Sequence, residues 1–143
     1  MRREFSAGGV LVRRMRGRWY VAAIRPGGKA PGVWALPKGG IGPGEDPGAT
    51  AVREVEEETG TRCKLDRKLG DVRYVYTWDG ERIFKVVSFF LVRWSGGRLG
   101  EIAPEFAIEV AEARWLPLED AARLLAYGGE RDMAARAIAE LGV

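Results

Sequence analysis

A glycine- and proline-rich stretch that runs directly into a capped helix constrains this 143-residue chain more than any other feature. Residues 26–48 read PGGKAPGVWALPKGGIGPGEDPG, a composition typical of loop. Asp46 is a good N-cap, Pro47 suits the first helical position, and Gly60 suits the position just past a helix end. The sequence therefore predicts a long loop that leads into a helix between Asp46 and Gly60.

Strand and turn signals surround this loop and helix. Apolar and β-branched runs predict strands over residues 5–13, 18–25, 69–78, 82–94 and 111–116. Gly17 is the turn signal between the first two runs, and the Asp79–Gly80 pair is the hairpin signal between the next two. Consecutive strands joined by tight turns indicate one central sheet system and not alternating βαβ units.

Two helices are expected in the C-terminal part, each with an apolar stripe that packs on the core. The first opens at Pro117 and Leu118, and its stripe is Ala121, Ala122, Leu124 and Leu125. The second begins near Glu130, and its stripe is Met133, Ala134, Ala137, Ile138 and Leu141. With no internal repeat or linker in view, residues 1–143 are predicted to form one domain that mixes α and β structure.

Composition removes several kinds of chemistry. The chain has no histidine, which excludes histidine zinc sites, Ser-His nucleophilic pairs and imidazole acid–base catalysis. Its one cysteine, Cys63, cannot form an internal disulfide, as suits a reducing cytoplasm. No apolar run approaches the roughly 20 residues of a membrane span, and the N-terminus has no secretion-signal pattern. We therefore expect a cytoplasmic protein without a membrane partner.

A concentrated acidic segment stands out in a chain whose net charge is +3. Glu54, Glu57 and Glu58 have helical spacing that puts all three carboxylates on one side of the predicted helix, here called the acidic face. Like charges this close repel one another, and either a shifted pKa or a bound divalent cation offsets the repulsion. An exposed helix balanced by scattered arginines is the alternative, and the acidic face alone does not decide between them.

The neighbouring residues favour the cation. Val52, Val55 and Thr59 form a second stripe that can pack on the sheet, while Glu56 points away and reads as a solvated residue. The glycines of the preceding loop let backbone groups approach a ligand closely. Lys38 in that loop is positioned to reach a phosphate oxygen. Together these features predict a site for a cation and a phosphate group.

Residues 39–61, GGIGPGEDPGATAVREVEEETGT, resemble the Nudix box. The residues that occupy its specified positions are Gly39, Glu45, Arg53, Glu54, Val55, Glu57, Glu58 and Gly60. Thr61 departs from the pattern because it stands where an aliphatic residue is usual, and Gly42 is a looser difference. Since neither lies among the carboxylates, we expect activity to survive both differences.

The resemblance implies a Nudix fold, which is an α/β/α sandwich around a mixed sheet, and hydrolysis of a nucleoside diphosphate linked to another group. It also implies Mg²⁺ or Mn²⁺ as the cofactor, with ligands from the acidic face and from the Gly39 carbonyl. Arg53 and Glu45 would pair and hold the loop and the helix in register.

Relatives often add an acidic residue from outside the box, for which Glu109 is our candidate and Glu105 the second choice. Glu109 is also what a strand-edge surface charge would look like. Divalent cations make a bound water more acidic and align it for in-line attack on phosphorus. Glu58, Glu54 and Glu109 are the candidate proton acceptors, and we favour Glu58.

Segments outside the box, including EFSAGGVL, WALPKG, YVYTWDGERIFKVVSFFLV and RWLPLEDAARLLAY, look like those of bacterial-type diadenosine tetraphosphate hydrolases. Tyr74 and Tyr76 alternate along a strand and so share a face, which offers a flat partner for a purine. Further candidate substrate contacts are Lys38, Arg82, Lys85 and Tyr127. Each aromatic residue has the alternative role of an ordinary strand or core residue.

The expected reaction is asymmetric hydrolysis of a dinucleoside polyphosphate, with ATP and AMP formed from the tetraphosphate. Two alternatives stay open. The first is a pyrophosphohydrolase of a nucleoside triphosphate or of the 5′ end of RNA, which is the one nucleic acid partner we would expect. The second is a nucleotide-binding module without turnover, although such a module would have no need of a repulsive acidic face. The oligomeric state, monomer or homodimer, is left open.

Overall fold

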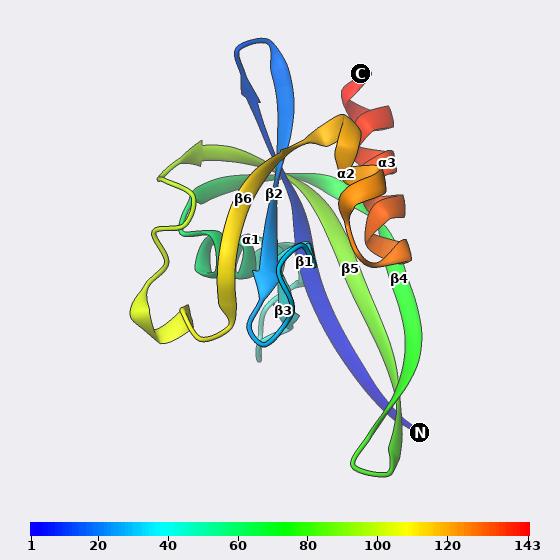
Figure 1. Ribbon diagram of the computed structural model, residues 1–143. Helices are drawn as coiled ribbons and strands as arrows, with labels where there is room; N and C mark the ends of the chain where they lie inside the picture. Colours follow the sequence, from blue (N-terminus) through cyan, green and yellow to red (C-terminus); the bar gives the residue numbers. More distant parts are fainter.

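One mixed sheet forms the centre of the computed structural model, which describes residues 1–143 (Figure 1). Its strands are β1 (Arg2–Met15), β2 (Arg18–Pro26), β3 (Lys38–Gly40), β4 (Arg62–Trp78), β5 (Glu81–Gly96) and β6 (Val110–Pro117). They lie in the order β4-β5-β1-β2-β6, with β3 paired to β1. The pairing of β1 with β5 is parallel and the other pairings are antiparallel, so the predicted mixed sheet is confirmed.

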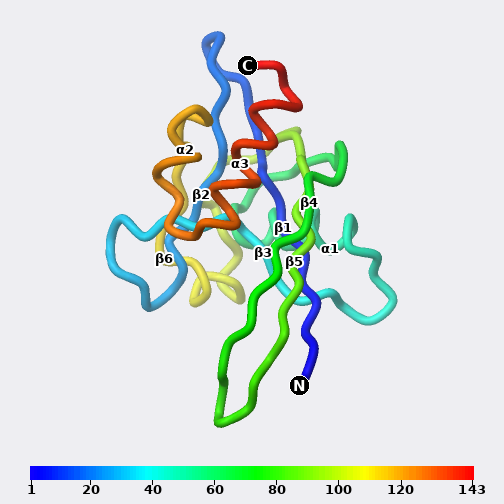
Figure 2. The backbone as a smooth tube through the Cα atoms, turned by 90° about the vertical axis from the view of Figure 1, so that its right-hand side faces the viewer, coloured from blue at the N-terminus to red at the C-terminus, as the bar shows by residue number.

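Helices cover both faces of this sheet. The α-helices are α1 (Pro47–Thr59), α2 (Leu118–Leu124) and α3 (Gly128–Leu141), and a 3₁₀ turn spans Pro104–Phe106. Val10 and Val12 of β1 pack in the core under α2 and α3, whereas Leu11 between them packs under α1. Figure 2 shows α1 and α2 on opposite sides of the strands. The expected α/β/α sandwich is therefore confirmed.

Helix α1 begins and ends as its sequence predicts. The Asp46 side chain accepts a hydrogen bond from the Ala49 amide at 2.8 Å, and Gly60 has the left-handed φ of 78° that ends the helix. A Cβ added to Gly9 of β1 would lie 2.6 Å from Cγ2 of Val55. This close packing fixes the helix, and with it the acidic face, against the sheet.

Some boundaries and burial patterns differ from those predicted. β4 begins at Arg62 and not at residue 69 as predicted. The sequence pattern does not reveal its first part, because three register shifts interrupt its pairing with β5 and many of its side chains are charged. Leu124 is exposed and does not belong to the apolar stripe of α2. Glu56 is only partly exposed, since its carboxylate accepts a hydrogen bond from the Cys63 amide at 3.0 Å. It therefore anchors the start of β4 and is not simply a solvated charge.

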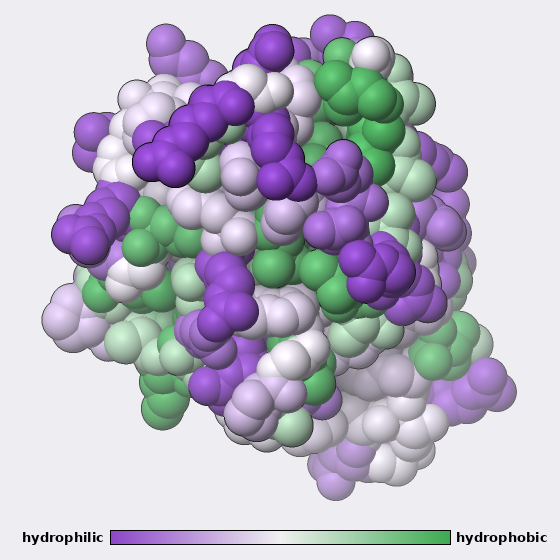
Figure 3. Space-filling view, turned by 45° about the horizontal axis from the view of Figure 1, so that its top comes forward, coloured by the Kyte–Doolittle hydropathy of each residue, from purple (hydrophilic) through white to green (hydrophobic).

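Polar and apolar side chains both reach the surface. Figure 3 shows polar side chains spread over the viewed face, with apolar residues in separate patches. The hairpin that joins β4 and β5 extends past the rest of the sheet, at the bottom of Figure 1, and the N-terminus lies beside it. Trp78 at that hairpin end is 69% exposed. None of the helices combines the length and apolar composition that crossing a membrane requires.

Replacing Leu11 by Ala is expected to lower the free energy of unfolding by about 2–5 kcal/mol, because a buried leucine under α1 leaves a cavity when truncated. Urea unfolding followed by circular dichroism measures the change. Leu65→Ala is the matched control, since Leu65 is 47% exposed and its truncation should change stability by less than about 0.5 kcal/mol. Equal losses in the two variants would contradict this packing.

Candidate active site

Arg53 forms ion pairs with three carboxylates of the candidate site. Its Nε lies 2.7 Å from Glu45 Oε2, so the pair expected from the sequence is present. Its Nη1 lies 2.7 Å from Glu57 Oε1 and 3.0 Å from Glu54 Oε1. Arg53 thus ties the loop before α1 to the acidic face of the helix.

Glu45 is fixed from several sides. It accepts hydrogen bonds from the Gly42 amide and the Thr50 hydroxyl, both at 2.9 Å. The Arg53 hydrogen bond, with the Gly42 amide next, lowers the pKa of Glu45 to about 2. A Cβ at position 42 would come within 2.7 Å of Glu45 Oε1, so the close approach of this carboxylate explains the glycine at that position.

Glu58 is the buried member of the acidic face. It is only 6% exposed, whereas Glu54 and Glu57 are partly exposed. Burial, followed by the adjacent Glu54 carboxylate, raises the pKa of Glu58 to about 9. The neighbouring backbone and charge of Lys38 act in the opposite direction on the pKa of this carboxylate. Burial and the Glu54 carboxylate both disfavour the ionised form of Glu58.

The backbone of β3 packs directly against the acidic face of α1. Gly39 pairs with Ala7 of β1, and a Cβ at Gly39 would overlap the carboxylate of Glu54. Only glycine lets the strand lie this close to the helix. The Gly39 backbone and the Glu54 side chain are therefore neighbours, as the sequence predicts for two ligands of one ion.

The oxygen donors suit a hard divalent cation, because Mg²⁺ and Mn²⁺ favour carboxylate and carbonyl ligands. The contact between Gly39 and Glu54 and the repulsion between Glu54 and Glu58 are both consistent with a cation bound there. The side chains do not form a ready cluster of three acidic ligands. Arg53 instead holds Glu57 and one oxygen of Glu54.

The predicted residues from outside the box lie apart from this arrangement. Glu109 is exposed in the turn before β6, where its backbone carbonyl accepts a hydrogen bond from the Gly27 amide at 2.9 Å. Glu105 is exposed in the 3₁₀ turn. No hydrogen bond or ion pair joins either side chain to α1. The structure does not bring either carboxylate to the acidic face.

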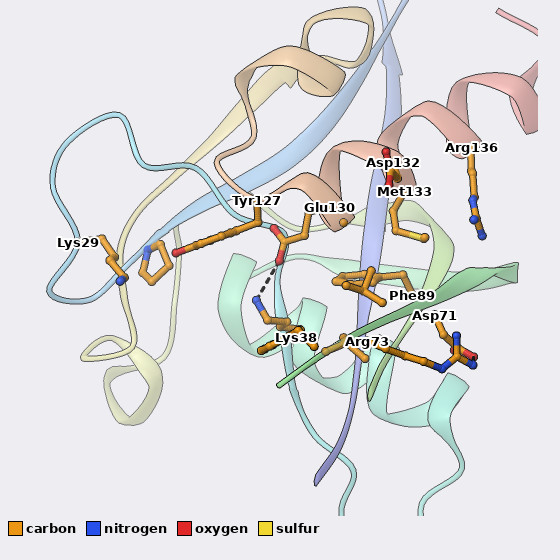
Figure 4. Close-up of a pocket in the computed structure, with 15 residues that line it drawn as sticks. Lys29, Lys38, Asp71, Arg73, Phe89, Tyr127, Glu130, Asp132, Met133 and Arg136 are labelled. Carbon is orange, nitrogen blue, oxygen red and sulfur yellow. Dashed lines mark hydrogen bonds and ion pairs between the residues drawn. The ribbon is translucent and has the colours of Figure 1, made fainter. Parts of the chain in front are cut away.

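A cavity of about 730 Å³ lies between the sheet and α3, on the side of the sheet opposite α1 (Figure 4). Three of the predicted substrate contacts, Lys38, Tyr74 and Tyr127, line it. Its other lining residues are Pro26, Lys29, Asp71, Val72, Arg73, Val87, Phe89, Gly129, Glu130, Asp132, Met133 and Arg136.

The other three predicted contacts lie outside the cavity, toward the hairpin end. Tyr76 donates a hydrogen bond to Glu4, and its ring centroid is 6.0 Å from that of Tyr74. Lys85 lies opposite Tyr74 in the sheet, and burial followed by the charge of Lys38 lowers its pKa. Arg82 is exposed next to the turn. The structure therefore divides the predicted contacts between the cavity and the neighbouring strand surface.

Glu130 is a site residue that the sequence interpretation missed. Its carboxylate accepts hydrogen bonds from the Leu36 amide at 2.7 Å and from Lys38 Nζ at 2.9 Å. Burial lowers the pKa of Lys38, but Glu130 outweighs burial and the net pKa is raised. The only signal at position 130 was an acid in the first turn of a helix, which is too common to indicate a distant partner.

The structure of the Thr61 position explains how the box tolerates a polar residue there. Thr61 is 3% exposed, and its hydroxyl is 2.8 Å from the Thr59 hydroxyl. Thr59 in turn donates to the Val55 carbonyl at 2.6 Å. Because each buried hydroxyl has a partner, the usual aliphatic side chain is replaced without an unsatisfied polar group.

Two known proteins are similar to this chain in sequence over most of its length. The chain is 39% identical over 135 residues to the protein named MutT4 of Mycobacterium tuberculosis, with 92% of this chain and 53% of that protein covered. It is 32% identical over 124 residues to the RNA pyrophosphohydrolase of Roseobacter denitrificans, with 78% and 76% covered. The chain thus spans about half the length of the first relative and three quarters of the second.

Solved structures and a family model complete the comparison. The fold is similar to that of a C. elegans Ap4A hydrolase in a binary complex, with a TM-score of 0.72, 23% identity, and 97% of this chain and 98% of that chain covered. The model of the NUDIX domain matches residues 3–137. This chain therefore belongs to the NUDIX domain family, as the box at residues 39–61 indicates.

Proposed function

We propose that this protein hydrolyses a phosphoanhydride bond in dinucleoside polyphosphates, and that it forms ATP and AMP from the tetraphosphate. One observation supports this more than any other. β3 lies between the acidic face of α1 and the cavity under α3, and Lys38 of β3 has neighbours on both sides of the strand. Lys38 is a neighbour of Glu58, and it also lines the cavity. We propose that a nucleoside bound in the cavity extends its phosphates past β3 toward the carboxylates.

The acidic face and the Gly39 carbonyl would hold Mg²⁺ or Mn²⁺, without Glu109, whose carboxylate lies apart from them. A divalent cation bound there supplies neutralisation of phosphate charge and a more acidic water. Arg53 keeps Glu57 and Glu54 in place from the side, and Lys38 binds a phosphate oxygen as a point charge. All of these groups stabilise charge without covalent chemistry, which is what phosphoryl transfer requires.

Glu58 is the proposed proton acceptor. A general base must reach the proton that it removes, and Glu58 belongs to the acidic face that would hold the cation and its water. Glu54 and Lys38 are its charged neighbours. Glu58 takes up the proton of the attacking water at a carboxylate oxygen, while Arg53 holds Glu54 and Glu57 in place.

The size and lining of the cavity support a nucleoside as the recognised group. About 730 Å³ is within the usual range for small-molecule sites. Tyr74 and Tyr127 are 41% and 40% exposed, so their rings are open to stacking on a base. Tyr76, Lys85 and Arg82 continue along the strands beyond the cavity, and they offer contacts to the remaining phosphates and second nucleoside of a long substrate.

Hydrolysis at the 5′ end of RNA is the second candidate, because a relative covered over three quarters of its length is an RNA pyrophosphohydrolase. Such a substrate shares the triphosphate group but has a polymer in place of the second nucleoside. For either substrate we propose a cytoplasmic location. The free, buried Cys63, whose pKa burial raises to about 12, suits a reducing compartment.

Product identification tests the proposal. The protein is incubated with Mg²⁺ and, separately, diadenosine polyphosphates, nucleoside triphosphates, ADP-ribose and triphosphorylated RNA, and the products are resolved by chromatography. We expect the highest kcat/KM with the tetraphosphate dinucleotide, and ATP and AMP as its products. A higher kcat/KM with triphosphates or RNA would overturn the substrate assignment. Binding without turnover of any compound would overturn the enzyme assignment.

Replacing Tyr74 by Leu is expected to raise KM for the dinucleotide about tenfold, which corresponds to about 1.4 kcal/mol and is within the range for loss of base stacking. Steady-state kinetics with the tetraphosphate dinucleotide measures the change. Trp78→Leu is the matched control, because Trp78 lies on the same strand, is 69% exposed, and does not line the cavity. If the two variants had the same KM, Tyr74 would not contact the base.

A further inference from the structure

An ion pair between buried Glu130 and partly buried Lys38 joins α3 to the start of β3. Glu130, in the first turn of α3, is 4% exposed and faces Lys38 across 2.9 Å (Figure 4). The same carboxylate accepts the Leu36 amide at 2.7 Å. One side chain from the end of the sequence therefore holds two alternate residues of the loop before the acidic helix. Neither the proposed phosphate contacts nor the proposed cation ligands include it.

β3 needs such an anchor because it is very short. It has three residues and pairs with β1 at only three positions. On one side its Gly39 backbone adjoins Glu54, where a Cβ has no room. β3 also packs closely on β1, since a Cβ added to Gly8 of β1 would lie 2.6 Å from Cβ of Lys38. A small displacement of β3 would therefore move both the Gly39 carbonyl and the Lys38 side chain.

Stability alone is a weak reason for this pair. A buried ion pair contributes little net stability, because the cost of removing two charges from water offsets their attraction. Its effect is geometric. Lys38 has two acidic neighbours, Glu130 in the cavity and Glu58 on the acidic face. The hydrogen bond to Glu130 keeps the ammonium group on the cavity side of β3.

We propose that Glu130 is a positioning residue, which holds Lys38 and β3 in the geometry that places the substrate phosphate beside the acidic face. This inference rests on the proposed function. Since Glu130 acts through Lys38, its removal should impair the chemical step more than substrate binding. In the Glu130→Gln variant the lysine still attracts phosphate, but nothing fixes its ammonium group where the transition state requires it.

The test compares Glu130→Gln with Glu140→Gln, the same chemical change on the same helix at an exposed ion pair with Arg67. For Glu130→Gln we expect kcat to fall at least about tenfold, since mispositioned groups cost large factors in rate. KM and the Kd of a methylene-bridged dinucleotide analogue should change by less than about threefold, the pattern of a group that acts in the transition state. Glu140→Gln should match the wild type in all three quantities.

A double-mutant cycle separates positioning from a structural role. In a Lys38→Met background, Glu130→Gln should lower kcat by less than about threefold, because the group through which it acts is already gone. An equal loss in both backgrounds would overturn the proposal, as would loss of analogue binding together with kcat. If Glu130→Gln fails to fold, Lys38→Met alone decides, and an unchanged kcat in that variant would also overturn it.

The inference and the proposed function can fail separately. Kinetics are measured on whichever phosphoanhydride the wild type cleaves. Absence of cleavage by the wild type contradicts the proposed function. Normal cleavage by both the wild type and Glu130→Gln contradicts only the positioning role.

Discussion

Glu58→Gln is expected to lower kcat by at least about 100-fold, which is the scale for removal of a general base. The amide has nearly the same shape as the carboxyl group but cannot accept the proton of the attacking water. Folding should be unaffected. Glutamine also fills the same buried space on α1 as the glutamate that it replaces.

Steady-state kinetics and thermal unfolding of the purified variant measure the two effects. Glu56→Gln is the matched control, because Glu56 is on the same helix but contacts the Cys63 amide and not the acidic face. We expect its kcat to stay within about threefold of the wild type, as for a surface change away from the reacting groups. A loss smaller than about tenfold for Glu58→Gln would remove Glu58 from the mechanism.

The second large effect is expected at Gly39. A Cβ at this position overlaps the Glu54 carboxylate, which is the mobile end of a flexible side chain. Glu54 can therefore swing away at little cost to folding, but only by leaving the place beside the Gly39 backbone. Because a misplacement of about 1 Å in an active site can cost about 100-fold in rate, we expect Gly39→Ala to lower kcat by about that factor.

The neighbouring glycine supplies the control for this prediction. A Cβ at Gly40 would meet no atom within 4 Å. Gly40→Ala should therefore retain kcat within about threefold of the wild type, as surface substitutions usually do. The two alanine variants are compared by kinetics and by thermal unfolding. If Gly39→Ala were as active as Gly40→Ala, the contact between β3 and Glu54 would have no part in the reaction.

Local sequence signals were sufficient where they act over a few residues. The Asp46 cap, the left-handed Gly60 and the spacing of the acidic face gave α1 and its orientation, because helix geometry depends on neighbours along the chain. The family resemblance supplied the α/β/α arrangement and the pairing of Arg53 with Glu45, and both are confirmed.

Contacts between residues far apart in the chain, and the burial that depends on tertiary packing, could not be predicted from local sequence signals. The interaction of Glu130 with Lys38 joins residues 92 positions apart, and nothing near either residue marks the other. The first part of β4 was missed because register shifts break the alternation of side chains on which strand prediction depends. Leu124 was assigned to the core from helical spacing, but α2 has only seven residues and Leu124, its last, remains exposed. Tertiary packing decided each of these outcomes.

Titration of the metal-free protein with Mn²⁺, followed by the relaxation of water protons, tests most directly whether the acidic face of α1 holds divalent cations. We expect saturable binding to the wild type and to Glu56→Gln. The affinity of Glu57→Gln should be at least about tenfold lower, because loss of a ligand should cost at least as much as loss of an outer-shell partner. Failure of the wild type to bind Mn²⁺, with or without nucleotide, or equal binding by all three proteins, would contradict the proposed site and the mechanism built on it.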